Sequence, residues 1–498
     1  MHDYKKIVIL IVLTLIIGWG ALLRIYKLGE QSYWIDEGYT LNAVLSTLEK
    51  GYPLLDSGQI ENASYLTTYL IAGAVKIAGF NPITTRIWAV IFGILMILLV
   101  YFWGKKFFNW QIGLTGSILI SFFYWGIAWS RQARMYIELQ FFFLLALYLF
   151  DSLLNKFSYK KLIYLILVTL GAILSHYFGY FLLLIYVVNL PLYLTLEQKQ
   201  QIKDFILTKK AKFAIGISLV IFIPIMIKLG IDLVEQLSRD RNILIGLSYQ
   251  SFLLNYLPII TILGFIGMII SVLQRKSLKI NALLISSFFI PYLTLILLAH
   301  SQHFRYLFFI LPILFFFSIY FLWFIANYFK NKYFVNVIFV ILILLLIVFS
   351  NYLKPQFFSF LPISHYYLEP FTPQPDFAKA YQAIKVSGWG DDKIIISPFT
   401  QMDKVYLGRS DYWLVMSLHG RPLDKEKVPE REYYNNSLNI ITKNQLEEII
   451  YSNHGYIVVD DMALSGNRLD QEIIELIGEQ EMIFSDNKPK YGIWVFKF

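Results

Sequence analysis

Long apolar runs dominate the first 350 residues of the chain, and each is close to the roughly 20 residues that a helix needs to cross a membrane. Hydrophobic residues make up 57% of the 498 residues and charged residues 15%, against about 25% charged residues in ordinary soluble domains. The sequence therefore predicts a polytopic α-helical membrane protein with about 11 transmembrane helices. The runs are 7–23, 87–104, 112–129, 135–154, 162–175, 178–196, 213–229, 252–273, 280–299, 306–326 and 333–350.

Charge divides the chain into two parts. Residues 355–498 carry 14 Lys and Arg against 20 Asp and Glu, net −6, whereas residues 1–354 carry 29 basic and 14 acidic groups, net +15. Strand-like and helix-like stretches alternate in the last part, which is typical of an α/β domain. We therefore expect a membrane domain over residues 1–354 and a soluble domain over 355–498. The strands are expected at 394–398, 456–460 and 492–498, and the helices near 376–387, 444–453 and 470–478.

Lysine residues predict how the chain crosses the membrane. One alternating set of loops carries 17 basic and four acidic groups, and the opposite set carries 12 basic and 10 acidic groups. By the positive-inside rule the lysine-rich set is cytoplasmic, so the N-terminus is inside and the C-terminal domain is extracytoplasmic. Lys76 and polar neighbours make residues 65–80 an expected interfacial helix, since another span there would reverse the bias. We expect a multi-pass protein of the plasma membrane.

Arginine is concentrated in the outer loops. The cytoplasmic set contains one arginine, whereas the outer set contains seven, namely Arg24, Arg86, Arg131, Arg134, Arg239, Arg241 and Arg305. The planar guanidinium group suits bidentate binding of phosphate or carboxylate. Anchoring of a helix end at the interface explains any one of these arginines, but the cluster indicates an anion site on the outer face.

The first outer loop, residues 24–86, contains the sequence YWIDEGYT with the adjacent acids Asp36 and Glu37. A carboxylate at this place suits a general base that accepts a proton from an attacking hydroxyl group. It also suits a metal ligand. A capped helix start beside an aromatic belt explains the same residues without chemistry, and the residues alone leave all three interpretations open.

The loop after the third expected span reads AWSRQARMYIEL. On a helix Arg131 and Arg134 would share one face, with Tyr136 close by. Two guanidinium groups at headgroup level are suited to stabilise a phosphate as a leaving group. Glu138 is a functional candidate because acids near the hydrocarbon region are costly, and an ion pair with Arg134 is its plain alternative.

Two further outer segments carry polar groups. SHYFGYF places His176 and Tyr177 after the fifth span, and AHSQHFRYLF places His303, Arg305 and Tyr306 before the tenth. Arg305 is suited to phosphate, whereas an interfacial histidine usually bonds to water or backbone. A divalent metal stays open, although no strict ligand spacing supports one. Cysteine is absent, which excludes thiolate ligands and cysteine nucleophiles.

The order and common side of these motifs resemble the GT-C superfamily, in particular the family 39-type transferases that use polyprenol-phosphate sugars. Protein O-mannosyltransferases and lipid A aminoarabinose transferases belong to that family, and the resemblance covers roughly residues 1–350. It implies that Asp36 is the catalytic base, with Glu37 beside it. It also implies that the lipid-phosphate site is lined by Arg131, Arg134, Tyr136, His176 and Arg305.

The chain departs from the family pattern at two places. It reads ENASYLTTYL where relatives commonly have a His-Pro-Pro-like segment, and it has Gln132 where many relatives have an acid between the two arginines.

The expected activity is transfer of a sugar from a polyprenyl-phosphate donor to an extracytoplasmic protein, lipid or glycan by inverting displacement. Membrane lipids are expected to surround the chain, and the absence of a basic tail argues against nucleic acid. A transporter or flippase for a lipid-linked or anionic substrate is the alternative, and it predicts repeats and broken helices that the sequence does not display. A receptor-like anchor for the outer domain leaves Asp36 and Glu37 unexplained.

Overall fold

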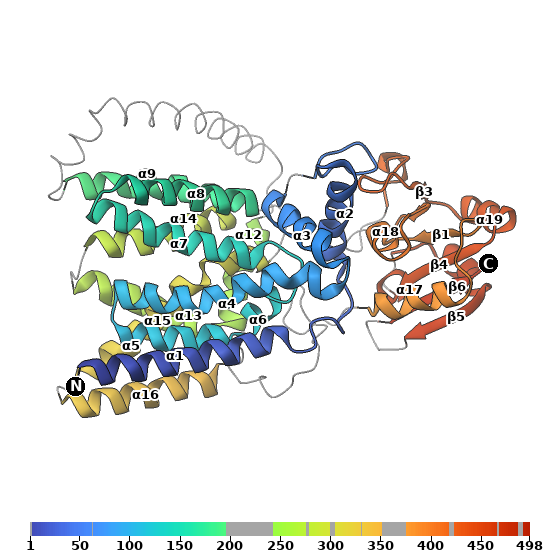
Figure 1. Cartoon of the computed structure of the whole chain (residues 1–498). Coiled ribbons are helices and arrows are strands. Elements are labelled where there is room, and N and C mark those ends of the chain that lie inside the picture. Colours follow the sequence, from blue (N-terminus) through green and yellow to red (C-terminus); the bar gives the residue numbers. More distant parts are fainter. Residues whose placement is uncertain are drawn as a thin grey trace, which may run out of the picture. The chain divides into compact units, whose positions relative to one another are not determined.

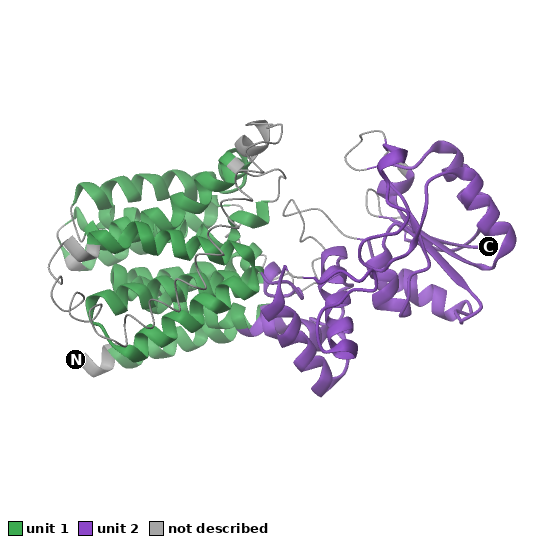
Figure 2. Cartoon of the chain, turned by 90° about the horizontal axis from the view of Figure 1, so that it is seen from above, with its two compact units in different colours: residues 1–23, 92–127, 136–359 green, residues 24–91, 128–135, 360–498 purple. Residues whose placement is uncertain are grey.

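The computed structural model describes residues 2–61, 63–195, 243–274, 278–298, 304–329, 331–350, 375–417, 423–465, 468–486 and 492–498. The chain divides into two compact units (Figure 2). Unit 1 comprises Met1–Leu23, Phe92–Ile127 and Tyr136–Ser359, and unit 2 comprises Arg24–Ile91, Ala128–Met135 and Phe360–Phe498. By these contacts, the first outer loop and the loop after the third expected span belong to the same unit as the C-terminal domain.

Unit 1 is a bundle of apolar helices (Figure 1). Five of the described helices are long and apolar enough to cross a membrane, and a sixth candidate is a bent pair. Ten of the eleven apolar runs fall on described helices, and the run 213–229 lies outside the described residues. The helices are α1 (His2–Ile25), α4 (Pro82–Phe107), α5 (Trp110–Phe122), α6 (Tyr124–Trp129), α7 (Tyr136–Asn155), α8 (Tyr159–Ser175), η1 (Tyr177–Tyr180), α9 (Phe181–Thr195), α12 (Ile243–Tyr256), α13 (Pro258–Leu273), α14 (Leu278–Leu298), η2 (Phe304–Ile310), α15 (Leu311–Asn327) and α16 (Lys332–Phe349).

Two of the runs expected as continuous helices are broken. The run 252–273 bends by 107° between α12 and α13, where Pro258 occupies the first turn of the new helix. Proline fits there because it lacks the backbone N–H that a preceding turn would need. The run 112–129 is interrupted by the extended residue Phe123 between α5 and α6.

Helix α15 lies in the middle of unit 1 and contacts α5, α13, α14 and α16. Its close approach to α13 depends on small residues, because a Cβ atom added at Gly267 would overlap the backbone carbonyl of Phe317. Small residues serve the same purpose in membrane helix pairs generally. The helices of unit 1 are therefore tightly packed at this pair.

Unit 2 contains a six-stranded sheet with the order β3-β2-β1-β4-β6-β5. Strands β3, β2, β1 and β4 are parallel to one another, and β6 pairs antiparallel with both β4 and β5. The three strands and three helices expected from the sequence are confirmed as β1, β4, β6, α17, α19 and α21. The strands are β1 (Ile394–Ser397), β2 (Tyr412–Leu414), β3 (Leu438–Ile440), β4 (Gly455–Asp460), β5 (Glu481–Asp486) and β6 (Ile493–Lys497). The helices are α2 (Ile35–Lys50), α3 (Tyr65–Ala78), α17 (Phe377–Val386), α18 (Thr400–Leu407), η4 (Lys425–Lys427), α19 (Lys443–Ser452), α20 (Asp461–Ser465) and α21 (Gln471–Gly478).

Both faces of the sheet are buried, as is usual for parallel strands. On one face Ile395 and Tyr456 join a core that also contains Leu41 of α2 and Ile71 of α3. A Cβ atom added at Gly38 would lie 2.8 Å from Met402 Sδ, so α2 and α18 are in close contact. The first outer loop therefore shares its hydrophobic core with the α/β domain. Helix α3 has 14 residues, fewer than the roughly 20 needed for a span, and its expected place on the membrane surface stays a prediction.

Acidic groups of the α/β domain differ in their exposure. Asp391 and Asp392 lie on the surface, as the sequence suggested. The same interpretation is wrong for Asp460, which is buried at the end of β4, accepts a hydrogen bond from Ala463 N, and has a pKa that burial raises to about 6. The sequence pattern could not separate these acids, because burial depends on packing against distant residues.

Candidate functional site

The first turn of α2 holds the two acids of the first outer loop. Both are buried, and their negative charge lies at the helix N-terminus, where the backbone dipole favours it. The Glu37 carboxylate accepts hydrogen bonds from Trp34 N at 3.0 Å and from Ala133 N at 2.8 Å. Glu37 thus joins the residue before α2 to the loop after α6.

Arg86 completes the surroundings of Glu37. Its Nε and Nη2 atoms each lie 2.8 Å from one Glu37 oxygen, and both side chains are fully buried. The remaining hydrogen bonds of the guanidinium group go to the carbonyl oxygens of Leu28, Gln31 and Ser32 at 2.9–3.1 Å. Each Glu37 oxygen therefore accepts two hydrogen bonds, and all five donors of Arg86 are used.

Asp36 faces a different arginine. Arg134 Nη2 lies 3.8 Å from Asp36 Oδ2, and Arg134 Nη1 donates to Asp36 O at 2.9 Å and to Thr40 Oγ1 at 2.7 Å. Only 5% of Asp36 is exposed. The structure therefore brings together the expected base and one expected phosphate-binding arginine.

Arg131 is placed differently from the sequence expectation. Residues 130–135 form an irregular turn between α6 and α7, so Arg131 and Arg134 lie in the expected loop and the shared face that a helix would give them does not arise. Arg131 Nη1 donates to Arg24 O at 3.1 Å and to Tyr26 O at 2.7 Å, and Nη2 donates to Lys27 O at 3.4 Å. These bonds satisfy carbonyl groups at the C-terminal end of α1, which a helix alone leaves unpaired.

The C-terminal domain holds the loop that precedes α2. Tyr406 Oη accepts a hydrogen bond from Tyr33 N at 3.1 Å, and Ala378 N donates to Ser32 Oγ at 3.0 Å. Within α2, Asn42 Nδ2 donates to Gln401 O at 3.0 Å. Burial raises the pKa of Tyr406 to about 12, so its hydroxyl group stays protonated near neutral pH.

In unit 1 the remaining candidates form an aromatic group around Arg305. The guanidinium carbon lies 5.7 Å from the centre of the Tyr136 ring and 5.8 Å from that of Tyr306. The His176 ring is 6.0 Å from Tyr136 and 6.2 Å from Tyr306, and its Nδ1 accepts a hydrogen bond from Phe178 N. Four residues from three separate sequence motifs are therefore brought together, whereas Arg131 and Arg134, which the resemblance assigned to the same phosphate site, are not part of this aromatic group.

The other candidates are Tyr177, Glu138 and His303. The Tyr177 ring is tilted against the His176 ring, with ring centres 4.1 Å apart, so Tyr177 borders this group. Tyr177 is 50% exposed, and Glu138 is buried in the first turn of α7. His303, like His300, Arg239 and Arg241, lies outside the described residues. Among the residues that the structure describes, no group of three or more His, Asp or Glu side chains is arranged to hold a metal ion.

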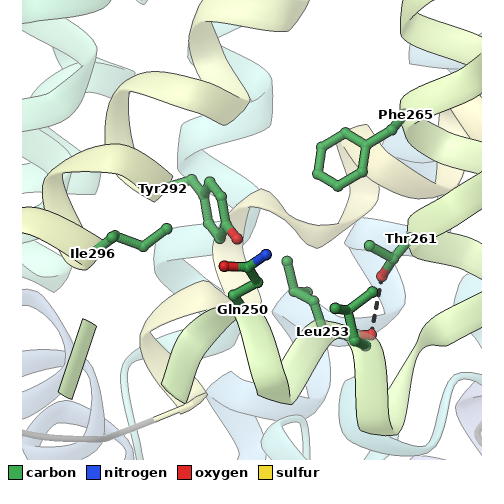
Figure 3. Close-up of a pocket in the computed structure, with 7 residues that line it drawn as sticks. Gln250, Leu253, Thr261, Phe265, Tyr292 and Ile296 are labelled. Carbon is green, nitrogen blue, oxygen red and sulfur yellow. Dashed lines mark hydrogen bonds between the residues drawn. The ribbon is translucent and has the colours of Figure 1, made fainter. Parts of the chain in front are cut away.

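Unit 1 also contains a cavity of about 260 Å³ beside the bend between α12 and α13 (Figure 3). Leucine, isoleucine and phenylalanine side chains supply most of its lining, whereas Gln250, Thr261 and Tyr292 are its polar members. Thr261 Oγ1 donates to Leu253 O, which satisfies a carbonyl group at the break. This lining suits an apolar chain rather than a sugar or a phosphate.

Sequence reasoning missed the roles of Arg86 and Tyr406. Arg86 was visible as one of the outer arginines, but its partner Glu37 lies 49 residues away. Tyr406 had no signal in the sequence, because its contact spans 373 residues.

Comparisons with known proteins concern the family and the fold. Residues 62–227, about one third of the chain, match the sequence model of the dolichyl-phosphate-mannose-protein mannosyltransferase family. No curated protein matches the sequence significantly. The matched segment includes Arg131, Arg134, Tyr136, Glu138 and His176, whereas Asp36 and Arg305 lie outside it.

Three solved structures share the fold. The apo oligosaccharyltransferase of Archaeoglobus fulgidus aligns with a TM-score of 0.60 and 12% identity over 96% of this chain and 73% of that chain. AglB of the same organism, in complex with an inhibitory peptide and dolichol-phosphate, gives 0.59 and 12% over 99% and 74%. ArnT of Cupriavidus metallidurans bound to undecaprenyl phosphate gives 0.57 and 11% over 100% and 98%.

The break between α12 and α13 is a feature that the transporter alternative predicts, but both the matched family and the structural neighbours are glycosyltransferases. The chain thus resembles membrane glycosyltransferases in two ways, through the mannosyltransferase family model over residues 62–227 and through the fold that it shares with the oligosaccharyltransferase and ArnT structures.

Proposed function

We propose that the protein transfers a sugar from a polyprenyl-phosphate donor to a hydroxyl group of an acceptor on the extracytoplasmic side of the membrane. The observation that carries the proposal is the pairing of buried Asp36 with Arg134 at the start of α2. Support comes from two structural neighbours that were solved with polyprenyl phosphates, AglB with dolichol-phosphate and ArnT with undecaprenyl phosphate.

The reaction is a single displacement with inversion. Asp36 takes the proton of the acceptor hydroxyl group as its oxygen attacks the anomeric carbon of the donor sugar. The bond between this carbon and the phosphate oxygen breaks, and polyprenyl phosphate leaves with the electron pair. A cationic group stabilises the charge that develops on the leaving oxygen.

Glu37 is a positioning residue in this proposal. Its two oxygens already accept four hydrogen bonds, so no position is left for a substrate proton without breaking the pair with Arg86. Arg131 is also a positioning residue, because its donors hold the carbonyl groups at the end of α1. The proposed catalytic function is therefore assigned to Asp36 alone.

Arg305 is the proposed phosphate-binding residue in unit 1, with His176, Tyr136 and Tyr306 around it. Its neighbour Phe304 stacks on Phe252 of α12 at 4.4 Å. The next residue of α12, Leu253, lines the apolar cavity. Because α12 contacts the segment of Arg305 and also lines the cavity, we propose that the cavity accommodates part of the isoprenoid chain while Arg305 contacts the phosphate.

The proposed location is the plasma membrane, and the lysine distribution supports a cytoplasmic N-terminus and an extracytoplasmic domain over residues 355–498. A reporter that is active only outside the cytoplasm, fused at the C-terminus, should be active. A silent reporter on a stably inserted protein would contradict this orientation.

Asp36→Asn tests the catalytic assignment. Asn keeps the size of the side chain but accepts no proton, so turnover should fall by about 10²–10⁴-fold. Turnover is measured with a panel of radiolabelled polyprenyl-phosphate sugars, and binding of undecaprenyl phosphate is measured separately and should be retained. Glu49→Gln, at an exposed position on the same helix, is the matched control. Unchanged turnover in Asp36→Asn would remove Asp36 from the chemistry.

A further inference from the structure

Three tyrosine rings meet beside α2 in unit 2. Tyr39 belongs to α2, and Tyr433 and Tyr434 belong to a turn of the C-terminal domain between η4 and β3. The Tyr39 and Tyr434 ring centres are 4.4 Å apart, and those of Tyr433 and Tyr434 are 5.0 Å apart. The first outer loop and the C-terminal domain thus contribute to one aromatic cluster.

This cluster lies one helical turn from the proposed base. Asp36 and Tyr39 are three residues apart on α2, and residues at that spacing are neighbours on a helix surface. Arg134 spans the same turn, since it donates to Asp36 O and to Thr40 Oγ1. The aromatic rings therefore lie within the reach of a molecule whose hydroxyl group is at Asp36.

The turn that carries two of the rings is held in place by its own hydrogen bonds. Glu432 Oε2 accepts from Tyr434 N at 2.8 Å and from Asn435 N at 2.7 Å. Asn436 adopts a φ of 59° and donates its N–H to Glu432 O, which closes the turn. A turn ordered in advance loses little conformational entropy when a ligand binds.

The surroundings of the cluster combine aromatic surface with charge. Tyr433 is 51% exposed, and Tyr434 and Tyr39 are partly exposed. Burial raises the pKa of Tyr434, the Glu61 carboxylate raises it further, and the Arg134 guanidinium group acts in the opposite direction. Aromatic faces bordered by a few charged and hydroxyl groups suit a sugar, whose ring has an apolar C–H face and a polar edge.

We propose that Tyr39, Tyr433 and Tyr434 form a subsite for a sugar ring of the acceptor, so the acceptor is a glycan or another carbohydrate-bearing molecule. This inference rests on the proposed function for Asp36. The attacking hydroxyl group must meet Asp36. A sugar ring that stacks on the tyrosines, one turn away along α2, therefore belongs to the acceptor that supplies this hydroxyl group.

Binding of simple glycosides tests the subsite without turnover. The full-length protein is placed in lipid nanodiscs, because detergents with sugar headgroups would compete, and a panel of methyl hexosides and disaccharides is tested by saturation-transfer difference NMR. Tyr434→Ala should weaken binding about tenfold by removing the stacking surface. Tyr434→Phe keeps the ring and should bind normally, as should the control Tyr451→Ala, which alters a tyrosine that is 80% exposed on α19.

Turnover separates the acceptor from the donor. Tyr434→Ala should raise the KM for the acceptor and leave the KM for the donor unchanged, whereas the reverse would assign the rings to the donor sugar and overturn the proposal. The proposed subsite is also overturned if no glycoside binds the parent protein, or if Tyr434→Ala binds glycosides as tightly as the parent protein does. Glycoside binding without any sugar transfer would support the subsite and overturn the proposed transferase reaction.

Discussion

Replacement of Glu37 by Gln separates a positioning role from a chemical one. The substitution removes the charge opposite Arg86, and the new NH₂ group replaces an oxygen that accepts two N–H groups. Two donors are then unpaired in either orientation of the amide. Each unpaired buried group costs about 1–3 kcal/mol, and breaking a buried ion pair on one side costs about 3–5 kcal/mol in total.

The loss should be visible as thermal destabilisation. For a unit of 150–250 residues about 1 kcal/mol corresponds to 2–4 °C, so the Tm of Glu37→Gln should fall by roughly 6–20 °C. The assay is the Tm of the full chain in detergent, with Glu49→Gln as the control on the same helix. Turnover should fall together with Tm and recover partly on cooling. A parental Tm with lost turnover would refute the positioning role, because it would place Glu37 in the chemistry.

Two other predictions use different groups. Arg131→Lys should lower Tm and leave undecaprenyl phosphate binding unchanged, since the guanidinium group of Arg131 bonds to backbone carbonyl groups. Arg305→Lys should weaken undecaprenyl phosphate binding and leave Tm at the parental value. The opposite pattern would exchange the roles of the two arginines. Burial raises the pKa of Asp403 to about 7, from about 3.9 in an unfolded chain. Between these values the unfolded state binds fewer protons, so the free energy of unfolding should fall as pH rises from about 4 to 7. Tm measured against pH should lose this slope in Asp403→Asn, and an unaltered slope would contradict the protonated state of Asp403.

The sequence predicted those helices and strands whose apolar or β-branched runs are long enough to be recognised. The β-branched runs at β1, β4 and β6 are four to six residues long, and ten of the eleven apolar runs match helices in the described part of the chain. Strands β2 and β3 have three residues each, which is too short for an alternating pattern. They exist because they pair with the strands beside them. Pro258 was a signal for the broken helix that periodicity concealed.

At the candidate site the residue types were predictable but their partners were not. Asp36 and Glu37 are adjacent in the sequence, yet one faces Arg134 and the other Arg86. The segment from Ser130 to Met135 was expected as a loop, but no sequence pattern indicated that Ala133 N donates to Glu37. Tertiary hydrogen bonds therefore fix the conformation of this segment, and the local sequence pattern does not reveal their distant partners.

The contacts between α2 and α18 have a consequence for the synthesis of the protein. Asn42 bonds to Gln401 O across 359 residues, and Tyr33 N bonds to Tyr406 across 373 residues. Domains usually fold in the order in which they are made, but α2 lacks these partners until almost the whole chain has been translated. We therefore expect the hydrogen bonds that hold α2 against α18 to form only after residues 400–406 have been synthesised. A polypeptide truncated before Thr400 would lack the partners that α18 supplies to Asn42 and Tyr33.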